Sequence, residues 1–172
     1  RIHLTQGLLF LPYGVAVDHF QHLVYSRPEA TAAERHGMWQ EMERTYRPWR
    51  DYGDLPHLPA GGFWQFQRHI YLHPFYYIDY ALAQTCAMQL WARAADDRDG
   101  AMDAYVKLCR RGGEAPFGEL APELAGGVLE VGGCGQDPET GRVGRVGVRA
   151  GIRSGASSAA CTMHGTAAST MP

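Results

Sequence analysis

The side chains that could do chemistry are concentrated between positions 61 and 80, where imidazoles and phenols follow a double glycine. His69 and His73 come just before three tyrosines, Tyr76, Tyr77 and Tyr80. A phenol is a neutral donor that can meet a developing oxyanion without a proton transfer. An imidazole can donate to a peptide carbonyl or exchange protons near neutral pH. The segment therefore suits hydrogen bonding to a carbonyl substrate. Tyr77 and Tyr80, three residues apart, share one helix face, and Tyr76 lies on a neighbouring face.

Two plainer interpretations of these residue types stay open at this point. Tyrosines at helical spacing are often half-buried packing residues whose hydroxyls are wet. The spacing of His69 and His73 would suit a metal on a continuous helix, but Pro74 keeps His73 out of the helical region. We therefore expect this pair to straddle a loop and a helix start. His19 and His22, three residues apart, have no third ligand in their pattern, so we favour neither pair as metal ligands.

Helices must position these residues, because no alternating strand pattern appears before Gly118. The apolar spacing predicts helices at 8–25, 31–47, 74–95, 100–111 and 117–124. Thr31 followed by Glu34 is typical of a capping box, and the double glycine at 112–113 is typical of a helix end. The prolines and glycines at 49–62 exclude a long helix there. The fold class predicted from the sequence is therefore all-α.

The composition excludes several classes of partner. The chain has 172 residues, of which 45% are hydrophobic, enough for one domain of ordinary size. The formal net charge of −2 gives no indication of nucleic acid or an anionic membrane as a partner. No apolar run approaches the roughly 18 residues of a membrane span, and no signal-peptide pattern is present. The four cysteines form no C-x-x-C pair, which fits a reducing compartment and a cytoplasmic location.

The composition changes sharply near Phe117. Every aromatic residue lies at or before Phe117, and no acidic residue follows Glu139. A segment rich in Gly, Ala, Ser and Arg buries too little apolar surface to offset the entropy of ordering it. We therefore expect a helical part at 1–117 and an atypical, disordered tail at 118–172. Either a natural disordered tail or a shifted reading frame would give this composition.

Two segments resemble the oligoendopeptidase F and thimet oligopeptidase family of zinc metallopeptidases. The first is Leu-Phe-Leu-Pro-Tyr-Gly-Val-Ala-Val-Asp-His-Phe-Gln-His at 9–22. The second is His-Ile-Tyr at 69–71, followed by Pro-Phe-Tyr-Tyr-Ile-Asp-Tyr at 74–80. The resemblance covers about residues 4–117 and extends to the order of the segments. It implies the all-helical fold of that family's catalytic domain, with a deep channel that admits short peptides.

The resemblance also implies roles for individual residues. In the family, zinc is held by the two His of an H-E-x-x-H motif and by a Glu on a following helix. This chain has no His-Glu dipeptide, and the order of the family's segments places the motif before the first residue. What remains by resemblance is the other side of the cleft. There His69, or His73 in its place, contacts the substrate backbone, and Tyr77 and Tyr80 stabilise the tetrahedral intermediate. Tyr76 is a further candidate for substrate binding.

We therefore expect the C-terminal, substrate-binding part of a zinc-dependent oligoendopeptidase. The resemblance implies zinc as the cofactor of the full-length enzyme, short peptides as substrates, and the missing N-terminal part of that enzyme as partner. The fragment alone is expected to bind no zinc and to be inactive. One alternative is a non-catalytic helical module that binds a partner through its Tyr-rich helix. Another is a stand-alone metal protein that uses its eight histidines. An H-E-x-x-H motif encoded upstream would favour the peptidase.

Overall fold

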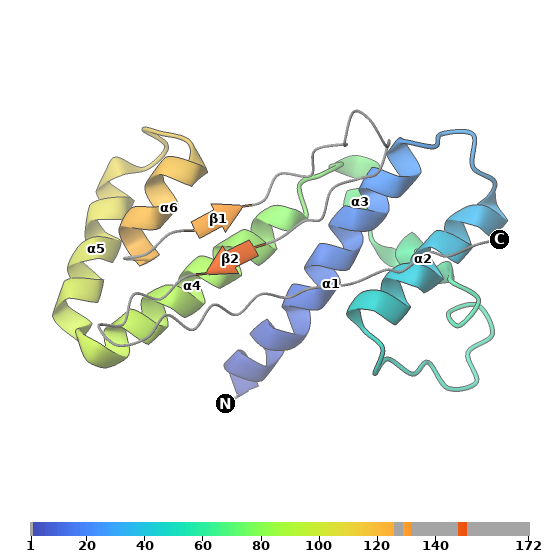
Figure 1. Ribbon diagram of the computed structural model, residues 1–172, viewed down its shortest axis with the longest axis horizontal. Helices are drawn as coiled ribbons and strands as arrows, with labels where there is room; N and C mark the ends of the chain where they lie inside the picture. Colours follow the sequence, from blue (N-terminus) through green and yellow to red (C-terminus); the bar gives the residue numbers. More distant parts are fainter. Residues whose placement is uncertain (1, 126–128, 132–147, 151–172) are drawn as a thin grey trace. The chain divides into compact units, whose positions relative to one another are not determined.

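Helices make up most of the part of the chain that the structure describes (Figure 1). This computed structural model describes residues 2–125, 129–131 and 148–150. The helices are α1 (Ile2–Tyr25), α2 (Ala32–Tyr46), the 3-10 helix η1 (Gly62–Phe66), α3 (His69–Leu72), α4 (Ile78–Asp96), α5 (Arg98–Arg111) and α6 (Phe117–Ala125). They confirm the predicted all-α class. Within these residues, no helix combines the length and the apolar character that a membrane span requires.

A pair of three-residue strands lies in the segment after α6, where the sequence analysis predicted none. β1 (Leu129–Val131) pairs with antiparallel β2 (Val148–Ala150), and Leu129 is opposite Ala150. The helix predicted at 117–124 is present as α6. Most of the tail at 118–172 lies outside the described residues, and so does the prediction that this tail is disordered.

The chain divides into two compact units after Ala81, within the first turns of α4. The first unit contains α1, α2, η1 and α3, and the second contains the rest of α4, α5, α6 and the two strands. The boundary predicted from composition lies elsewhere, at Phe117. The division into 1–117 and 118–172 therefore stays a prediction.

The core of the first unit forms where α1, α2 and η1 meet. Phe20 and Trp39 are fully buried, and their rings meet edge to face with centroids 5.2 Å apart. Trp64 of η1 lies 5.2 Å from Phe20. Aromatic pairs of this kind contribute about 0.5–1.5 kcal/mol each beyond the area they bury. Met38 and Met42 are buried as well. This core fixes α1 against α2 and η1.

Helix boundaries in the first unit follow the sequence prediction where a local signal sets them. At the start of α2, the Glu34 carboxylate accepts from the Thr31 N–H at 2.7 Å, and Thr31 Oγ1 accepts from the Glu34 N–H at 3.3 Å. This is the predicted capping box. By contrast, α1 begins at Ile2, six residues before the predicted start at residue 8, and continues through Pro12. A proline inside a helix removes one backbone hydrogen bond, so it weakens a helix without necessarily ending it.

The second unit has a small core of its own. α5 begins two residues before the predicted start at Gly100, because the Asp97 carboxylate caps it by accepting from the Gly100 N–H at 2.9 Å. Gly112 ends α5 with a φ of 53°, as the double glycine predicted. Cys86 is a buried free thiol. It packs in a cluster with Leu90, Leu108, Ala121 and Leu124.

Candidate functional site

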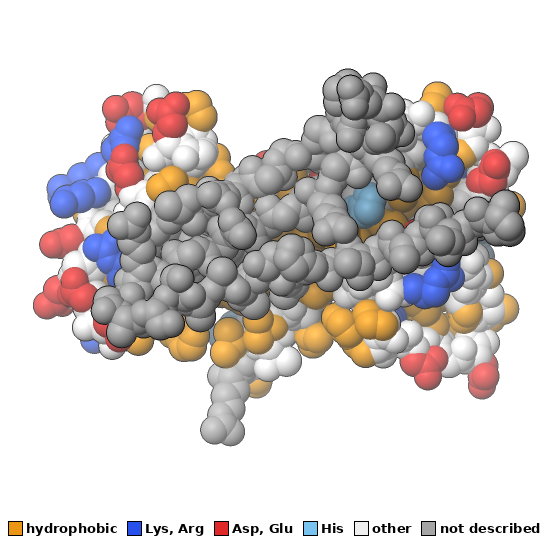
Figure 2. All heavy atoms as spheres, viewed as in Figure 1, with side chains coloured by type: hydrophobic (Ala, Val, Ile, Leu, Met, Phe, Trp, Pro, Cys, Tyr) orange, Lys and Arg blue, Asp and Glu red, His pale blue; other side chains and the backbone are white. Residues whose placement is uncertain are grey.

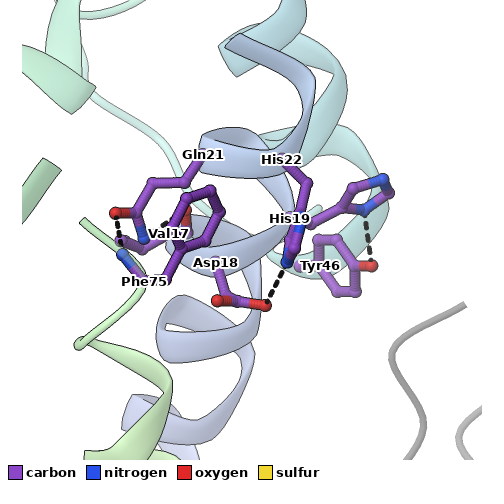
Figure 3. A network of polar contacts seen from close by, with 7 residues as sticks. All are labelled: Val17, Asp18, His19, Gln21, His22, Tyr46 and Phe75. Carbon is purple, nitrogen blue, oxygen red and sulfur yellow. Dashed lines mark hydrogen bonds and ion pairs between the residues drawn. The ribbon is translucent and has the colours of Figure 1, made fainter. Parts of the chain in front are cut away.

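The residues just before α4 form a turn. The sequence analysis had predicted that they form the first turn of the helix. α4 begins at Ile78, four residues after Pro74. Between them, Phe75 has a φ of 62°, in the left-handed region that a bulky residue rarely adopts. Its backbone N–H donates to Oε1 of Gln21 on α1 at 2.8 Å (Figure 3). Gln21 is fully buried, so a side chain far away in the sequence holds this turn. Local sequence rules could not reveal that contact, and the predicted helix start was therefore wrong.

Gln21→Leu is expected to lower the free energy of unfolding by about 1–3 kcal/mol. The substitution leaves the Phe75 N–H without its acceptor, beside a strained backbone. Urea unfolding followed by tryptophan fluorescence measures the change. Gln40→Leu is the matched control, because the Gln40 amide also bonds to the backbone of a loop, here by donating to the Pro59 carbonyl at 2.7 Å, but on an exposed surface. It should change stability by no more than about 0.5 kcal/mol. Equal effects of the two substitutions would show that Gln21 does not hold the turn.

All five site residues predicted from the sequence come together around one imidazole ring. We call His69, His73, Tyr76, Tyr77 and Tyr80 the His–Tyr cluster. The ring centroid of His69 lies 5.0 Å from that of Tyr77 and 5.8 Å from that of Tyr80. It lies 6.2 Å from Tyr76 and 6.2 Å from His73. Tyr80 is also 5.5 Å from Tyr77 and 5.4 Å from Tyr76. Because α4 begins after Tyr77, the helical spacing that placed Tyr76 on a separate face does not apply.

The His–Tyr cluster is anchored on one side and open on the other. Tyr77 is half-buried, and its ring lies 5.7 Å from Tyr13 and 5.9 Å from Phe10, both on α1. Tyr76 and Tyr80 are 48% and 43% exposed. Burial, and then the neighbouring Tyr80, raises the pKa of Tyr77. A hydrogen bond with Tyr76, and then desolvation, raises the pKa of Tyr80. Both phenols are therefore neutral hydrogen-bond donors at neutral pH, within reach of a ligand.

Two residues that the sequence analysis missed support the cluster. Tyr13 on α1 donates from its hydroxyl to Oε1 of Gln67 at 2.7 Å. Nε2 of Gln67 in turn lies 2.6 Å from Nδ1 of His69. Gln67 is held in the short connection between η1 and α3. The sequence carried a signal only through position, since Tyr13 belongs to the Leu-Pro-Tyr-Gly string and Gln67 stands two residues before His69.

A buried cation holds Tyr13 in place, and the sequence analysis missed it as well. The Arg47 side chain is almost fully buried, with its guanidinium carbon 4.9 Å from the centroid of the Tyr13 ring and 5.5 Å from that of Phe63. A cation over an aromatic face is attracted by the ring, and more so when water is excluded. Arg47 also pairs with the Glu43 carboxylate at 3.1 Å, and the same oxygen accepts from the Tyr52 hydroxyl at 2.9 Å.

The histidines on α1 have structural partners. Nδ1 of His19 lies 2.9 Å from the Tyr46 hydroxyl, and Nε2 of His22 lies 3.6 Å from the Asp18 carboxylate (Figure 3). Among residues 2–125 and the two short strands, no group of three His, Cys, Asp or Glu residues could hold a metal ion. The His–Tyr cluster itself offers phenols beside its two imidazoles, where a zinc site needs a third imidazole, thiolate or carboxylate. The described residues therefore do not fit the zinc that the family resemblance implies.

A separate hollow of about 220 Å³ lies in the first unit and contains none of the five cluster residues. It is lined by Val24, Tyr25, Pro28, Arg35, Trp64, Ile70 and Tyr71. Tyr71 stacks on Trp64 there, with ring centroids 5.8 Å apart. Tyr71 thus belongs to the same Tyr-rich segment as the cluster but lies outside it, which makes it a useful control.

Two solved structures match this chain over most of its length. One is an X-ray structure assigned to an oligoendopeptidase F, with a TM-score of 0.68 and 58% sequence identity over 72% of this chain. The other is PZ peptidase A with an inhibitor, with a TM-score of 0.69 and 53% identity over 74% of this chain. Each match covers 22% of the other chain, so this chain spans about a fifth of the structures it matches. No family model and no curated protein matches it.

The chain is therefore related to the oligoendopeptidase F-type peptidases and corresponds to a part of such a protein. This confirms the resemblance that the segments at 9–22 and 69–80 indicated.

Proposed function

We propose that this chain is the substrate-binding and transition-state-stabilising part of a zinc-dependent oligoendopeptidase that hydrolyses short peptides. The observation that carries this proposal is the His–Tyr cluster. It places the phenols of Tyr77 and Tyr80 beside the imidazole of His69, open to solvent on one side. The 58% identity to a structure assigned to an oligoendopeptidase F supports the reaction class.

The two phenols act on the oxygen of the scissile peptide bond. In this proposal the carbonyl oxygen lies against the hydroxyls of Tyr77 and Tyr80, which both donate hydrogen bonds to it. Charge grows on this oxygen as the tetrahedral intermediate forms, and a bond from a fixed donor strengthens with that charge. Packing against α1 holds Tyr77, and the first turn of α4 holds Tyr80, so the donors need little reorganisation during the reaction.

The other cluster residues position the peptide. His69 donates to a backbone carbonyl of the substrate. His73 ends α3, with its N–H bonded to the carbonyl of His69 at 3.0 Å, and its side chain together with exposed Tyr76 extends the contact. Contacts of this kind raise the rate by holding the scissile bond in a reactive orientation.

The rest of the enzyme is the proposed partner, and it holds the zinc, because the described residues here offer no fitting ligand set. Exposed apolar side chains support such a partner. On α1, Ile2, Leu8 and Leu9 are 75%, 53% and 54% exposed, and Figure 2 shows hydrophobic side chains at the surface on the face in view. Clustered apolar exposure is typical of a surface that packs against another part of a protein. A cytoplasmic location stays a proposal, in line with the free thiols of Cys86 and Cys109.

The isolated chain is expected to show no cleavage of a quenched oligopeptide and to hold no stoichiometric zinc by elemental analysis. A chimera in which this chain replaces the matching segment of the oligoendopeptidase F relative should cleave the peptide, with the unaltered relative as positive control. Chelator-sensitive cleavage by the isolated chain would contradict the proposal that the rest of the enzyme holds the zinc. A chimera that folds and holds zinc but is inactive favours the alternative, a helical module without catalytic use.

A further inference from the structure

We infer that Gln67 is a positioning residue that places the hydrogen of the neutral His69 imidazole on Nε2, and that Tyr13 orients Gln67 for this task. The hydrogen-bonded series Tyr13–Gln67–His69 joins α1 to the first residue of α3. The use of the Nε2 hydrogen to bind substrate rests on the proposed function. The position of that hydrogen follows from the contacts alone.

The orientation of the Gln67 amide comes first. Its oxygen only accepts hydrogen bonds and its nitrogen only donates them. The Tyr13 hydroxyl donates to the oxygen at 2.7 Å, and burial raises the pKa of Tyr13, so this hydroxyl keeps its hydrogen. The cation beside the ring, Arg47, offers donors only and cannot replace the acceptor. With the opposite amide orientation, the Tyr13 hydroxyl hydrogen would have no acceptor among the contacts of the described residues. Buried polar groups that lack a hydrogen-bond partner are rare in folded proteins because they are destabilising.

The tautomer of His69 follows from this orientation. The Gln67 nitrogen, facing Nδ1 at 2.6 Å, can only donate, so Nδ1 must accept. A hydrogen on Nδ1 would point at the hydrogens of the amide. The single hydrogen of the neutral imidazole is therefore on Nε2, because the hydrogen bond that Gln67 makes to Nδ1 determines the tautomer. Within the described residues, Nε2 makes no hydrogen bond to the protein and remains available to a ligand.

This arrangement makes His69 a fixed donor beside two others. The rings of Tyr77 and Tyr80 lie 5.0 and 5.8 Å from the imidazole, and both carry neutral hydroxyls. A peptide backbone presents carbonyl acceptors at regular intervals, so a group of donors matches it without any net charge on the protein. An Nδ1–H tautomer would turn an acceptor toward the same carbonyl and repel it.

The tautomer is measured by ¹⁵N nuclear magnetic resonance of the whole chain with labelled histidine. At about pH 8.5 an ordinary imidazole is neutral, so the two ring nitrogens report which one carries the hydrogen. The His69 signals are assigned by their loss in His69→Gln. The expected result is a protonated Nε2 and a bare Nδ1. In Gln67→Glu the carboxylate can only accept, so the hydrogen should move to Nδ1. In Gln67→Leu, which removes the partner altogether, a mixture of the two tautomers is expected.

A matched control exists on the neighbouring turn. Gln65 makes a similar contact with a different histidine, with its Oε1 2.9 Å from Nε2 of His57. Gln65→Glu should therefore leave the His69 signals unchanged. A protonated Nδ1 in the unaltered chain overturns the inference, and so does a Gln67→Glu spectrum identical to that of Gln65→Glu.

Activity of the chimera separates this inference from the proposed function. Gln67→Glu is expected to raise KM about tenfold with little change in kcat, since one hydrogen bond to bound substrate is lost before and during the reaction. Gln65→Glu should leave both constants unchanged. If the tautomer moves as expected while KM does not, the positioning of His69 stands and its proposed contact with substrate is wrong. If KM rises but the tautomer does not move, the inference itself is overturned.

Discussion

Tyr77→Phe and Tyr80→Phe are each expected to lower kcat of the active chimera by about 10²–10³, the usual loss for one oxyanion donor. The substitution removes only a hydroxyl, and both rings keep their packing around His69. A fixed donor gains most of its strength once the carbonyl oxygen is charged, so its loss affects the transition state more than the substrate. KM and zinc content should therefore change little. Steady-state kinetics on a quenched peptide, with elemental analysis of each variant, measure both.

Two other tyrosines show whether the effect is specific. Tyr71→Phe removes a hydroxyl from the same segment but outside the His–Tyr cluster, where Tyr71 stacks on Trp64. It should leave kcat near that of the unaltered chimera. Tyr76→Phe, which removes a hydrogen-bond partner of Tyr80, should have an intermediate effect. If Tyr77→Phe and Tyr80→Phe behave like Tyr71→Phe, these phenols only pack, and the catalytic assignment is wrong.

Arg47→Met is expected to lower the free energy of unfolding by about 3–5 kcal/mol, because it leaves a carboxylate unpaired in a buried position. The side chains of Arg47 and Glu43 are only 10% and 14% exposed, and within the described residues Oε2 of Glu43 already has no hydrogen-bond partner. The substitution also removes the cation from the faces of Tyr13 and Phe63. Urea unfolding measures the change.

The control for this prediction is an ion pair at the surface. Arg111→Met breaks the contacts of Arg111 with Glu114 and Glu123, whose side chains are 63% and 54% exposed, and should cost no more than about 1 kcal/mol. The double substitution Arg47→Met with Glu43→Gln should recover much of the stability lost in Arg47→Met, since the unpaired charge is gone. Equal losses for Arg47→Met and Arg111→Met would mean that burial does not set the strength of the Arg47 pair.

Features of the fold that short sequence patterns control were predictable. The capping box of Thr31 and Glu34 marked the start of α2, and the double glycine marked the end of α5. Boundaries that depend on contacts between distant segments were not. The start of α4 was placed at Pro74 because proline favours a first helical position, whereas Gln21 holds Phe75 in a left-handed turn.

The candidate site shows the same limit. Residue types and family resemblance named His69, Tyr77 and Tyr80, and the structure brings them together. Neither signal could assign a role to Gln67 or Tyr13, although Tyr13 lies in one of the resembling segments, because each acts through a partner 54 positions away. The residue types alone, a glutamine in a loop and a tyrosine in a helix, do not predict that the two side chains are in contact.

The spacing of two side chains on α1 constrains how this helix can change during evolution. Tyr13 binds Gln67, and Gln21 binds the backbone at Phe75. The segment 67–75 is therefore attached at both of its ends to helix α1. Tyr13 and Gln21 are eight positions apart in the sequence, which corresponds to about 12 Å along an α-helix. Inserting or deleting one residue between them would rotate one fastening point by about 100° relative to the other. Related chains can therefore exchange many of the intervening amino acids, but the number of residues between the two points should stay constant.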